Sequence, residues 1–490
     1  MLNDKITEDI NNISKDKFVL VQDDVKILDK ELVTKPIGYF EDAWLRFKRN
    51  KGSVIAAIII VILILFAVIV PMVSKYEMKF TDGFYSYTLP KHETFAKLGF
   101  WDGCKDYEYN QKTYDYLMGI PGAVKETKSV REEKGENYYT VNVDTYMRPG
   151  YVYKSLTKGE FDALVEYDAN QPEGNKVMYP MVNTKKIKNP GFQKDPNYWF
   201  ESTMKGVAIL DDNGDYKPIY KVDSDTGEYV YWETKMGGDQ YKVRVLYYEY
   251  FNYANGFYPE FIFGTDGFGQ DVLVRLAFGA RLSLMLGFCV AAVNIFNGTI
   301  WGAIEGYYGG LTDLLMERFA EILGSVPSIV TFALFQMYFA SKVGVVWTLV
   351  FAFLLTGWIS PAWRVRSQFY RFKGQEYVLA ARTLGAKDKR IIFRHILPNA
   401  IGTIITSTVL IVPGVIFSES TLSYLGIVDL QTSNVTSVGT LLKNGQSCLS
   451  TFPHVILFPS LFISLLMISF NLFGNGLRDA LNPSLRGTEN

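Results

Sequence analysis

The chain has 490 residues, of which 48% are hydrophobic and 21% charged, and its net charge is −1. Such a balanced charge gives no global field for binding nucleic acid. A bilayer core is crossed by about 20 apolar helical residues, so uncharged stretches of that length predict a membrane protein and exclude a purely soluble enzyme or a disordered chain. Six such stretches stand out: 52–74, 282–304, 322–341, 343–363, 395–418 and 444–477.

The N-terminal segment, 1–51, carries the first orientation signal. Arg46, Lys48 and Arg49 stand directly before the first uncharged stretch. Because positive charge favours the cytoplasmic side of a membrane, we expect this segment in the cytoplasm and a first transmembrane helix over 52–74. The apolar and aromatic residues around Trp44 predict a short helix lying at the membrane interface, and a solvated linker is the alternative.

Residues 75–262 are polar and are predicted to form an extracellular α+β domain. They hold 25 of the 32 tyrosines of the chain. The ranges 137–143, 229–233 and 241–250 favour strands, whereas Thr157 and Glu160 form a capping-box pattern before a short helix. The acidic turns 211–215 and 223–227 loosely resemble calcium loops but lack the glutamate at the twelfth position. The tyrosines either line a recognition surface or are ordinary sheet residues.

Residues 263–482 are predicted to form five further spans. The range 305–321 is expected as a cytoplasmic turn, and 364–394, with nine basic groups against two acidic ones, as a cytoplasmic loop. The last span returns the tail, 483–490, to the cytoplasm. Six spans with both ends inside satisfy all of the charge asymmetries.

The three cysteines give no metal or redox spacing. Cys289 lies in an apolar run and is expected to be a packing residue. Whether Cys104 and Cys448 pair outside the cell stays open. No metal or cofactor site is expected in the chain.

The loop before the fifth span has an apolar helical face. Tyr377, Ala380, Ala381 and Leu384 recur at helical spacing, and Gly385 follows at a helix-ending position. A second helix is expected from Asp388 and should end at 397–399, because proline terminates helices. The two helices predict a compact projection for docking another surface, where a solvated loop would need no such face.

Several segments together resemble the oligopeptide/dipeptide permease family of ABC importers, C-type subunit. The loop from Glu376 to Asn399 is similar to the family's EAA loop. The other matching segments are Phe263–Val272, Gly279–Leu284 and Glu419–Gly426. The resemblance covers about 40–73 and 262–482, whereas 75–262 is far longer than the loop usual in the family.

This resemblance implies a type I importer permease fold with six spans. It also implies a second permease subunit, two ATPase subunits, an extracellular peptide-binding lipoprotein and the cytoplasmic membrane of a bacterium. The EAA loop would then be the coupling helix that docks into an ATPase subunit. The coupling residues carried over from the family are Glu376, Tyr377, Ala380, Ala381, Arg382, Gly385 and Ala386.

Two positions and one short range depart from the family pattern. Leu379 replaces the glutamate of the EAA triplet, although Glu376 also occurs in the pattern, and Gln270 replaces an arginine. The range 434–439 replaces a stretch rich in proline and tryptophan, so that outer loop need not keep a family role.

Polar residues within the spans are candidates for the translocation path. An intramembrane carboxylate is costly and marks a functional hypothesis, so Glu419 either meets the amino terminus of a peptide or bonds a neighbouring helix. Asn294 and Asn471 are further candidates. Pro327 and Pro413 are expected to bend their spans.

The sequence contains no G-x-x-x-x-G-K-[ST] motif. ATP and Mg²⁺ are therefore expected on partner subunits, and the chain is expected to be a transporter subunit rather than an enzyme. The leading hypothesis is a peptide importer permease. The alternatives are a membrane-anchored receptor or surface-assembly protein, and a permease for another cargo such as nickel or a glycoside.

Overall fold

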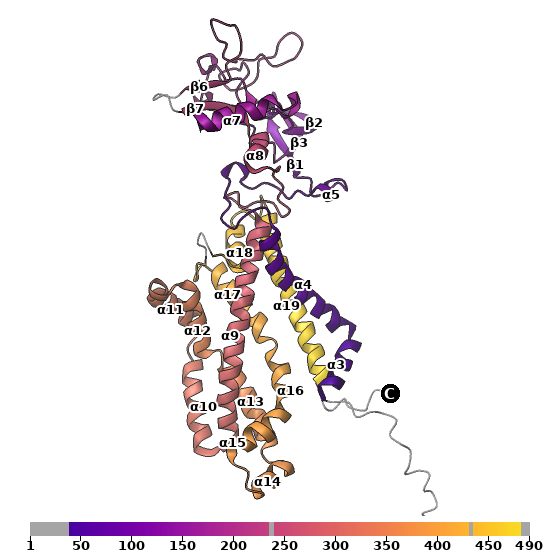
Figure 1. Cartoon of the computed structure of the whole chain (residues 1–490), viewed down its shortest axis with the longest axis vertical. Helices are drawn as coiled ribbons and strands as arrows, with labels where there is room; N and C mark the ends of the chain where they lie inside the picture. The colour runs from indigo at the N-terminus through magenta and orange to yellow at the C-terminus, as the bar shows by residue number, and fades with distance from the viewer. Residues whose placement is uncertain (1–38, 235–239, 431–434, 482–490) are drawn as a thin grey trace, which may run out of the picture.

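The computed structural model describes residues 39–234, 240–430 and 435–481. Most of the N-terminal segment and the predicted tail lie outside the described residues. The molecule is elongated, with an α-helical bundle below and an α+β domain at one end (Figure 1). We call the end of the bundle next to this domain the domain end, and the opposite one the far end.

The bundle is built from apolar helices that pack along the long axis of the molecule. The first two, α3 (Tyr39–Arg49) and α4 (Lys51–Val73), lie beside the last, α19 (His454–Leu481). The helix predicted around Trp44 is therefore present as α3. The other bundle helices are α9 (Val272–Tyr308), α10 (Gly310–Gly324), α11 (Ser328–Val343), α12 (Val345–Thr356), α13 (Ile359–Phe372), α16 (Leu397–Thr408), α17 (Ile411–Tyr424) and α18 (Val438–Gln446).

Among the described residues, five helical stretches are long and apolar enough to cross a membrane, and the bent pair α10–α11 makes a sixth if it counts as one span. The two halves of that pair meet at 70°, and Pro327 is the residue before α11. The predicted bend is therefore present. The expected turn over 305–321 is wrong, because α9 continues to Tyr308 and α10 begins at Gly310.

A glycine seam holds α9 against α13. Gly298, Gly302 and Gly306 recur every fourth residue, and a Cβ atom on Gly302 would lie 2.2 Å from the carbonyl oxygen of Ala362. Small residues at this spacing let two membrane helices approach backbone to backbone. The far-end segment of α9 is thereby fixed to α13, which leads into the predicted coupling loop.

The described residues of the α+β domain form two antiparallel sheets. One has the strand order β1-β3-β2, and the other has the order β4-β7-β5 with β6 on β7. The capping box at Thr157 starts α7 (Lys158–Ala169) as predicted. The remaining elements named here are β1 (Cys104–Asn110), β2 (Val124–Glu133), β3 (Glu136–Asp144), β4 (Tyr151–Thr157), β5 (Met178–Tyr179), β6 (Trp232–Thr234), β7 (Gln240–Leu246) and α8 (Tyr247–Asn255).

The predicted strand over 241–250, the two acidic turns and the cysteines differ in how well they match the structure. The strand expected over 241–250 ends at Leu246, where α8 begins. The two acidic turns are Asx turns, because the Asp211 and Asp223 carboxylates accept backbone N–H groups two residues onward. Those hydrogen bonds lower the pKa of both carboxyls. The cysteines are free, and Cys289 is exposed rather than packed.

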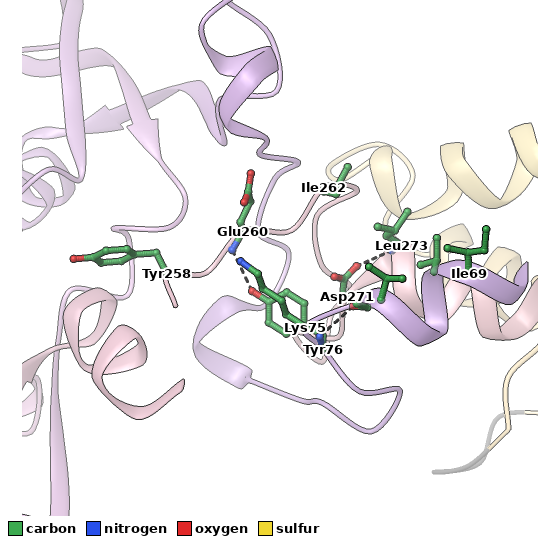
Figure 2. Close-up of a pocket in the computed structure, with 11 residues that line it drawn as sticks. Ile69, Lys75, Tyr76, Tyr258, Glu260, Ile262, Asp271 and Leu273 are labelled. Atoms are coloured by element: carbon green, nitrogen blue, oxygen red, sulfur yellow. Dashed lines mark hydrogen bonds between the residues drawn. The ribbon is translucent and has the colours of Figure 1, made fainter. Parts of the chain in front are cut away.

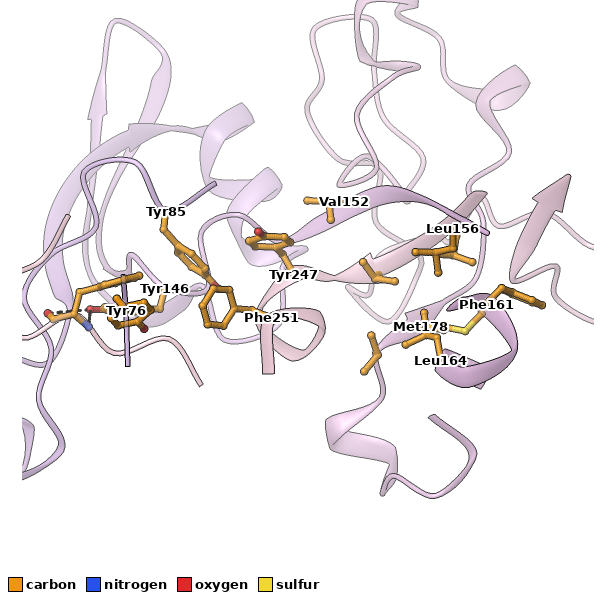
Figure 3. Close-up of a cluster of buried hydrophobic side chains, with 14 of the residues drawn as sticks. Tyr76, Tyr85, Tyr146, Val152, Leu156, Phe161, Leu164, Met178, Tyr247 and Phe251 are labelled. Atoms are coloured by element: carbon orange, nitrogen blue, oxygen red, sulfur yellow. Dashed lines mark hydrogen bonds between the residues drawn. The ribbon is translucent and has the colours of Figure 1, made fainter. Parts of the chain in front are cut away.

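Aromatic side chains form much of the domain's core and reach the bundle. Figure 3 shows Tyr76, Tyr85, Tyr146 and Phe251 in one buried group with the sheet residues. At the seam with the bundle, Tyr87 stacks on Phe452 with ring centroids 4.3 Å apart. The domain is therefore packed onto the domain end of the bundle, not merely tethered to it.

A pocket of about 340 Å³ lies where α4 passes into the domain. Ile69 and Leu273 line its bundle side, and Tyr258 and Glu260 its domain side (Figure 2). Asp271 also lines it and caps α9 by accepting the N–H of Leu273 at 2.8 Å.

Candidate functional site

The predicted coupling loop forms a projection at the far end of the bundle, visible below α9 and α13 in Figure 1. It consists of α14 (Glu376–Thr383), a turn at Gly385, and α15 (Asp388–Arg390) followed by the π-helical segment η6 (Ile391–Ile396). We call residues 376–396 the knob.

The inner side of the knob is anchored in the bundle. Val378, Ile391 and Ile396 are fully buried and pack with Phe369 of α13 and Tyr307 of α9. A solvated loop would have no reason to bury these apolar side chains, so the knob is a folded part of the bundle.

The outer side of the knob exposes apolar residues. Leu384 at the tip is 87% exposed, and Tyr377, Leu379 and Phe393 are 40–55% exposed. Among the residues predicted to share a contact face, Ala380 is exposed and Ala381 half-buried. Ala386 instead packs partly against the anchoring core. Glu376 is exposed in the first turn of α14.

Gly385 makes the turn between the two helices. Its φ of +82° lies in the left-handed region that favours glycine, and no atom lies within 4 Å of where a Cβ would stand. The N–H of Ala386 donates to the carbonyl of Ala381 at 3.0 Å and closes the end of α14. The tip thus has a defined shape before any partner binds.

A hydrogen-bonded link joins the knob to α9. Tyr307 donates its hydroxyl hydrogen to Asp388 at 2.6 Å, and Arg382 donates to the same hydroxyl oxygen at 3.4 Å. Arg382, predicted as a polar partner for another subunit, therefore also holds the knob. Tyr307 was missed because nothing in its local sequence shows that it lies beside Asp388, 81 residues onward.

The second helix of the knob does not end where expected. Leu397 donates its N–H to Ile392, five residues back, and α16 continues through Pro398. The wider π turn accommodates a residue that lacks an N–H group. The predicted stop at 397–399 is therefore wrong.

The three path candidates lie in different environments. Glu419 is fully buried and accepts hydrogen bonds from Ser283 at 2.9 Å and Ser423 at 3.0 Å. Asn294 is also buried and donates to the carbonyl of Phe353 at 3.4 Å. Asn471 is exposed and bonds its own helix at Met467. The structure does not bring the three together.

A groove whose lining includes several polar residues runs between α13 and α16. It has a volume of about 320 Å³. Arg364 donates to the backbone carbonyl of Ser407 across it, so both helices shape the groove. Its lining is Ser360, Trp363, Arg364, Ser367, Gln368, Thr403 and Ser407.

Comparison with known families places these features in context. The family described as the binding-protein-dependent transport system inner membrane component matches residues 294–487. The N-terminal transmembrane domain of oligopeptide transport permease C matches residues 38–90. The range 91–293, which holds most of the α+β domain and the first part of α9, is matched by neither.

Individual relatives decide the assignment. The oligopeptide transport system permease protein OppC of Bacillus subtilis is 44% identical over 224 residues, which are 46% of this chain and 72% of the relative. The chain belongs to the oligopeptide/dipeptide permease family. The dipeptide permease DppC of the same organism is 41% identical over 225 residues, 46% of this chain and 69% of the relative.

Membership in this permease family fixes the fold as that of a type I ABC importer permease and makes the chain a multi-pass membrane protein. The OppC protein of Haemophilus influenzae is 40% identical over 224 residues, covering 46% of this chain and 70% of the relative. Among solved structures, a chain of the inward-facing MetNI methionine ABC transporter matches with a TM-score of 0.36 and 14% identity, over 42% of this chain and 96% of that one.

Proposed function

We propose that the chain is a membrane-spanning permease subunit of an ATP-driven peptide importer. Its relatives at 40–44% identity are permeases of oligopeptide or dipeptide transport systems. The chain has the bundle of such a permease and no phosphate-binding loop motif of its own. ATP and Mg²⁺ are bound, and ATP is hydrolysed, on separate partner subunits.

The knob is the coupling element in this proposal. The observation that carries it is the contrast between its two sides: Val378 is fully buried, whereas Leu384 is 87% exposed. An apolar tip on a rigid base suits insertion into a cleft of an ATPase subunit, since exposed apolar surface marks an interaction site. Glu376 and Arg382 at the rim supply polar contacts.

The complete transporter contains a second permease subunit, two ATPase subunits and an extracellular peptide-binding lipoprotein. We place it in the cytoplasmic membrane of a bacterium, with both termini and the knob in the cytoplasm and the α+β domain outside. The basic residues beside α4 and around the knob support this orientation through the positive-inside rule.

The groove between α13 and α16 is the better candidate for the path than the buried polar residues. A groove with arginine, serine and glutamine side chains is costly against lipid, so its place is against the second permease subunit. Arg364 would offer a peptide carboxylate a positive charge there. Glu419 and Asn294 are enclosed by helices of this chain and serve its packing.

The test is co-purification of the ATPase subunits with Leu384→Asp. The side chain of Leu384 makes few contacts within the chain, so the variant is expected to unfold at the wild-type temperature. A carboxylate in an apolar cleft is strongly disfavoured, so we expect the ATPase subunits to be lost from the purified complex.

Leu384→Met, which keeps an apolar tip, is the matched control and should retain the ATPase subunits. Normal co-purification and normal peptide-stimulated ATP hydrolysis in Leu384→Asp would remove the knob from the coupling mechanism.

A further inference from the structure

An acidic cluster lies at the far end of the bundle, where α9 turns into α10 around Gly309. Glu305 of α9 and Asp313 and Glu317 of α10 each bring a carboxylate oxygen to within 4.8 Å of the others. This cluster lies outside the knob and the groove. Nothing in peptide transport by the chain requires three carboxylates at one point.

Two members of the cluster have a cationic partner. Arg366 of α13 donates to both oxygens of Asp313, at 2.6 and 2.9 Å, and lies 2.6 Å from a Glu317 oxygen. Tyr370 donates to Asp313 at 2.6 Å. These contacts hold the α10 carboxylates in place but compensate only part of the negative charge.

The third member has no such partner. Glu305 is 0% exposed, and neither of its carboxylate oxygens accepts a hydrogen bond among the described residues. The indole nitrogen of Trp301, one turn earlier on α9, is also buried and lies near this carboxylate without the geometry of a full hydrogen bond. Lys373, the other nearby cation, donates to the carbonyl of Gly306 at 2.8 Å instead. A buried carboxylate without a partner is strongly unfavourable in its charged form, so Glu305 either carries a proton or is compensated by a cation from outside the chain.

We propose that Glu305, Asp313 and Glu317 bind a hard divalent cation of the Mg²⁺, Mn²⁺ or Ca²⁺ class. Such ions prefer carboxylate oxygens and take several of them at roughly 2.0–2.6 Å. Two ligands on opposite sides of one ion are therefore separated by at most about 4–5 Å, and the three carboxylate oxygens, which lie within 4.8 Å of one another, meet this limit. The charge of +2 would meet the uncompensated carboxylate of Glu305.

The position of the site gives the ion a structural role. Its ligands come from both sides of the turn at Gly309. Arg366 of α13 forms an ion pair with Asp313 and so connects α13 to the same site. Glu305 is two residues from Tyr307, which bonds Asp388 of the knob. The ion would therefore fix α9, α10 and the base of the knob relative to one another. Asp313 and Glu317, 13% and 18% exposed, would form its entrance.

The test is Mn²⁺ binding to the nucleotide-free full chain in nanodiscs of phosphatidylcholine, followed by electron paramagnetic resonance. We expect Glu305→Gln, which keeps the size of the side chain and removes its charge, to bind one Mn²⁺ ion fewer than wild type or to bind it at least tenfold more weakly. Wild type should also unfold at a higher temperature with Mn²⁺ than with a chelator, and Glu305→Gln should not.

Glu321→Gln is the matched control, because Glu321 lies one turn further along α10 and pairs with Arg318; it should bind Mn²⁺ as wild type does. Glu317→Gln removes a different ligand. If Glu305→Gln does not fold, Mn²⁺ binding to Glu317→Gln tests the proposal instead, with the same expected loss. Equal Mn²⁺ binding in wild type and the folded variant would overturn the proposal and assign a proton to Glu305. Because Mn²⁺ binding is measured and not transport, the result does not depend on whether the proposed transport function is correct.

Discussion

Glu419 illustrates how a buried carboxylate is accommodated in the bundle. Ser283 of α9 and Ser420 and Ser423 of α17 all donate hydroxyl hydrogens to it. A carboxylate that accepts several hydrogen bonds has its desolvation compensated. The side chain therefore joins two helices, which is the structural alternative left open by the sequence, and it is fully buried rather than open to a path.

We expect Glu419→Ala to destabilise the purified chain by about 2–4 kcal/mol, because buried hydroxyls lose their acceptor at roughly 1–3 kcal/mol each. Glu419→Gln, which keeps one acceptor oxygen, should lose less. Thermal unfolding in nanodiscs measures both. Peptide uptake should change equally for free and N-acetylated peptides. A rise in KM confined to peptides with a free amino terminus would show that Glu419 contacts the substrate in the translocation path.

Asp271 gives the domain end a pH-dependent stability. Burial raises the pKa of its carboxyl from 3.8 to about 7, and backbone N–H groups of Val274 and Leu273 oppose the shift. The folded chain therefore holds more protons than the unfolded chain between about pH 4 and 7, and stability falls as pH rises through that window. Burial also raises the pKa of the neighbouring Asp266, so its carboxyl contributes to the pH dependence with the same sign.

Replacing Asp271 by asparagine isolates its contribution. Asparagine caps a helix as well as aspartate does and carries no charge. We expect Asp271→Asn to unfold at a higher temperature than wild type at pH 8 and to show a flatter dependence between pH 4 and 7. Asp271→Ala, which loses the cap, should be less stable than Asp271→Asn at every pH. Parallel pH profiles for wild type and Asp271→Asn would contradict the assignment.

At the scale of single elements, the turn of the knob tests coupling. Valine at position 385 would have to adopt a left-handed conformation that costs about 1–2 kcal/mol, although the space around the residue is open. We expect Gly385→Val to distort the tip and to abolish peptide-stimulated ATP hydrolysis by the assembled transporter. Gly385→Asn, which tolerates this conformation, should remain coupled. Full stimulation in Gly385→Val would show that the shape of the tip is unimportant.

The elements that could be predicted from sequence are those set by local chemistry. Uncharged length located the candidate spans, the capping box at Thr157 located α7, and the glycine at 385 located the turn of the knob. The stop at Pro398 was wrong because a π turn changes the hydrogen-bond pattern that proline interrupts. The acidic cluster was missed because 305–321 was expected to be a turn, whereas α9 and α10 bring Glu305, Asp313 and Glu317 together across the bend at Gly309.

At the scale of the whole molecule, the orientation in the membrane can be tested directly. Ser129 in the α+β domain and Thr383 in the knob are both exposed and lie at opposite ends of the molecule. With the three native cysteines replaced, we expect Ser129→Cys to react with an impermeant maleimide on intact cells and Thr383→Cys to react only after lysis. The reverse pattern would overturn the proposed orientation.

The α+β domain contacts the bundle at the end where substrate would enter. Tyr87 stacks on Phe452, and the ring centroids of Trp101 and Phe458 of α19 are 5.9 Å apart. The knob and its link to Asp388 lie at the opposite end (Figure 1). In the proposed orientation, we expect the domain to act on substrate delivery and not on the ATPase cycle.

Replacing residues 80–258 by a short Gly/Ser linker separates these roles. We expect basal ATP hydrolysis of the assembled transporter to be retained, because the knob and its anchoring core are untouched, and uptake that depends on the peptide-binding lipoprotein to fall. Tyr87→Ala is the matched control: it keeps the domain and loosens only the seam, so it shows how much of the loss comes from Phe452 losing its partner. If the deletion variant transports peptide at the wild-type rate, the domain acts only as a spacer.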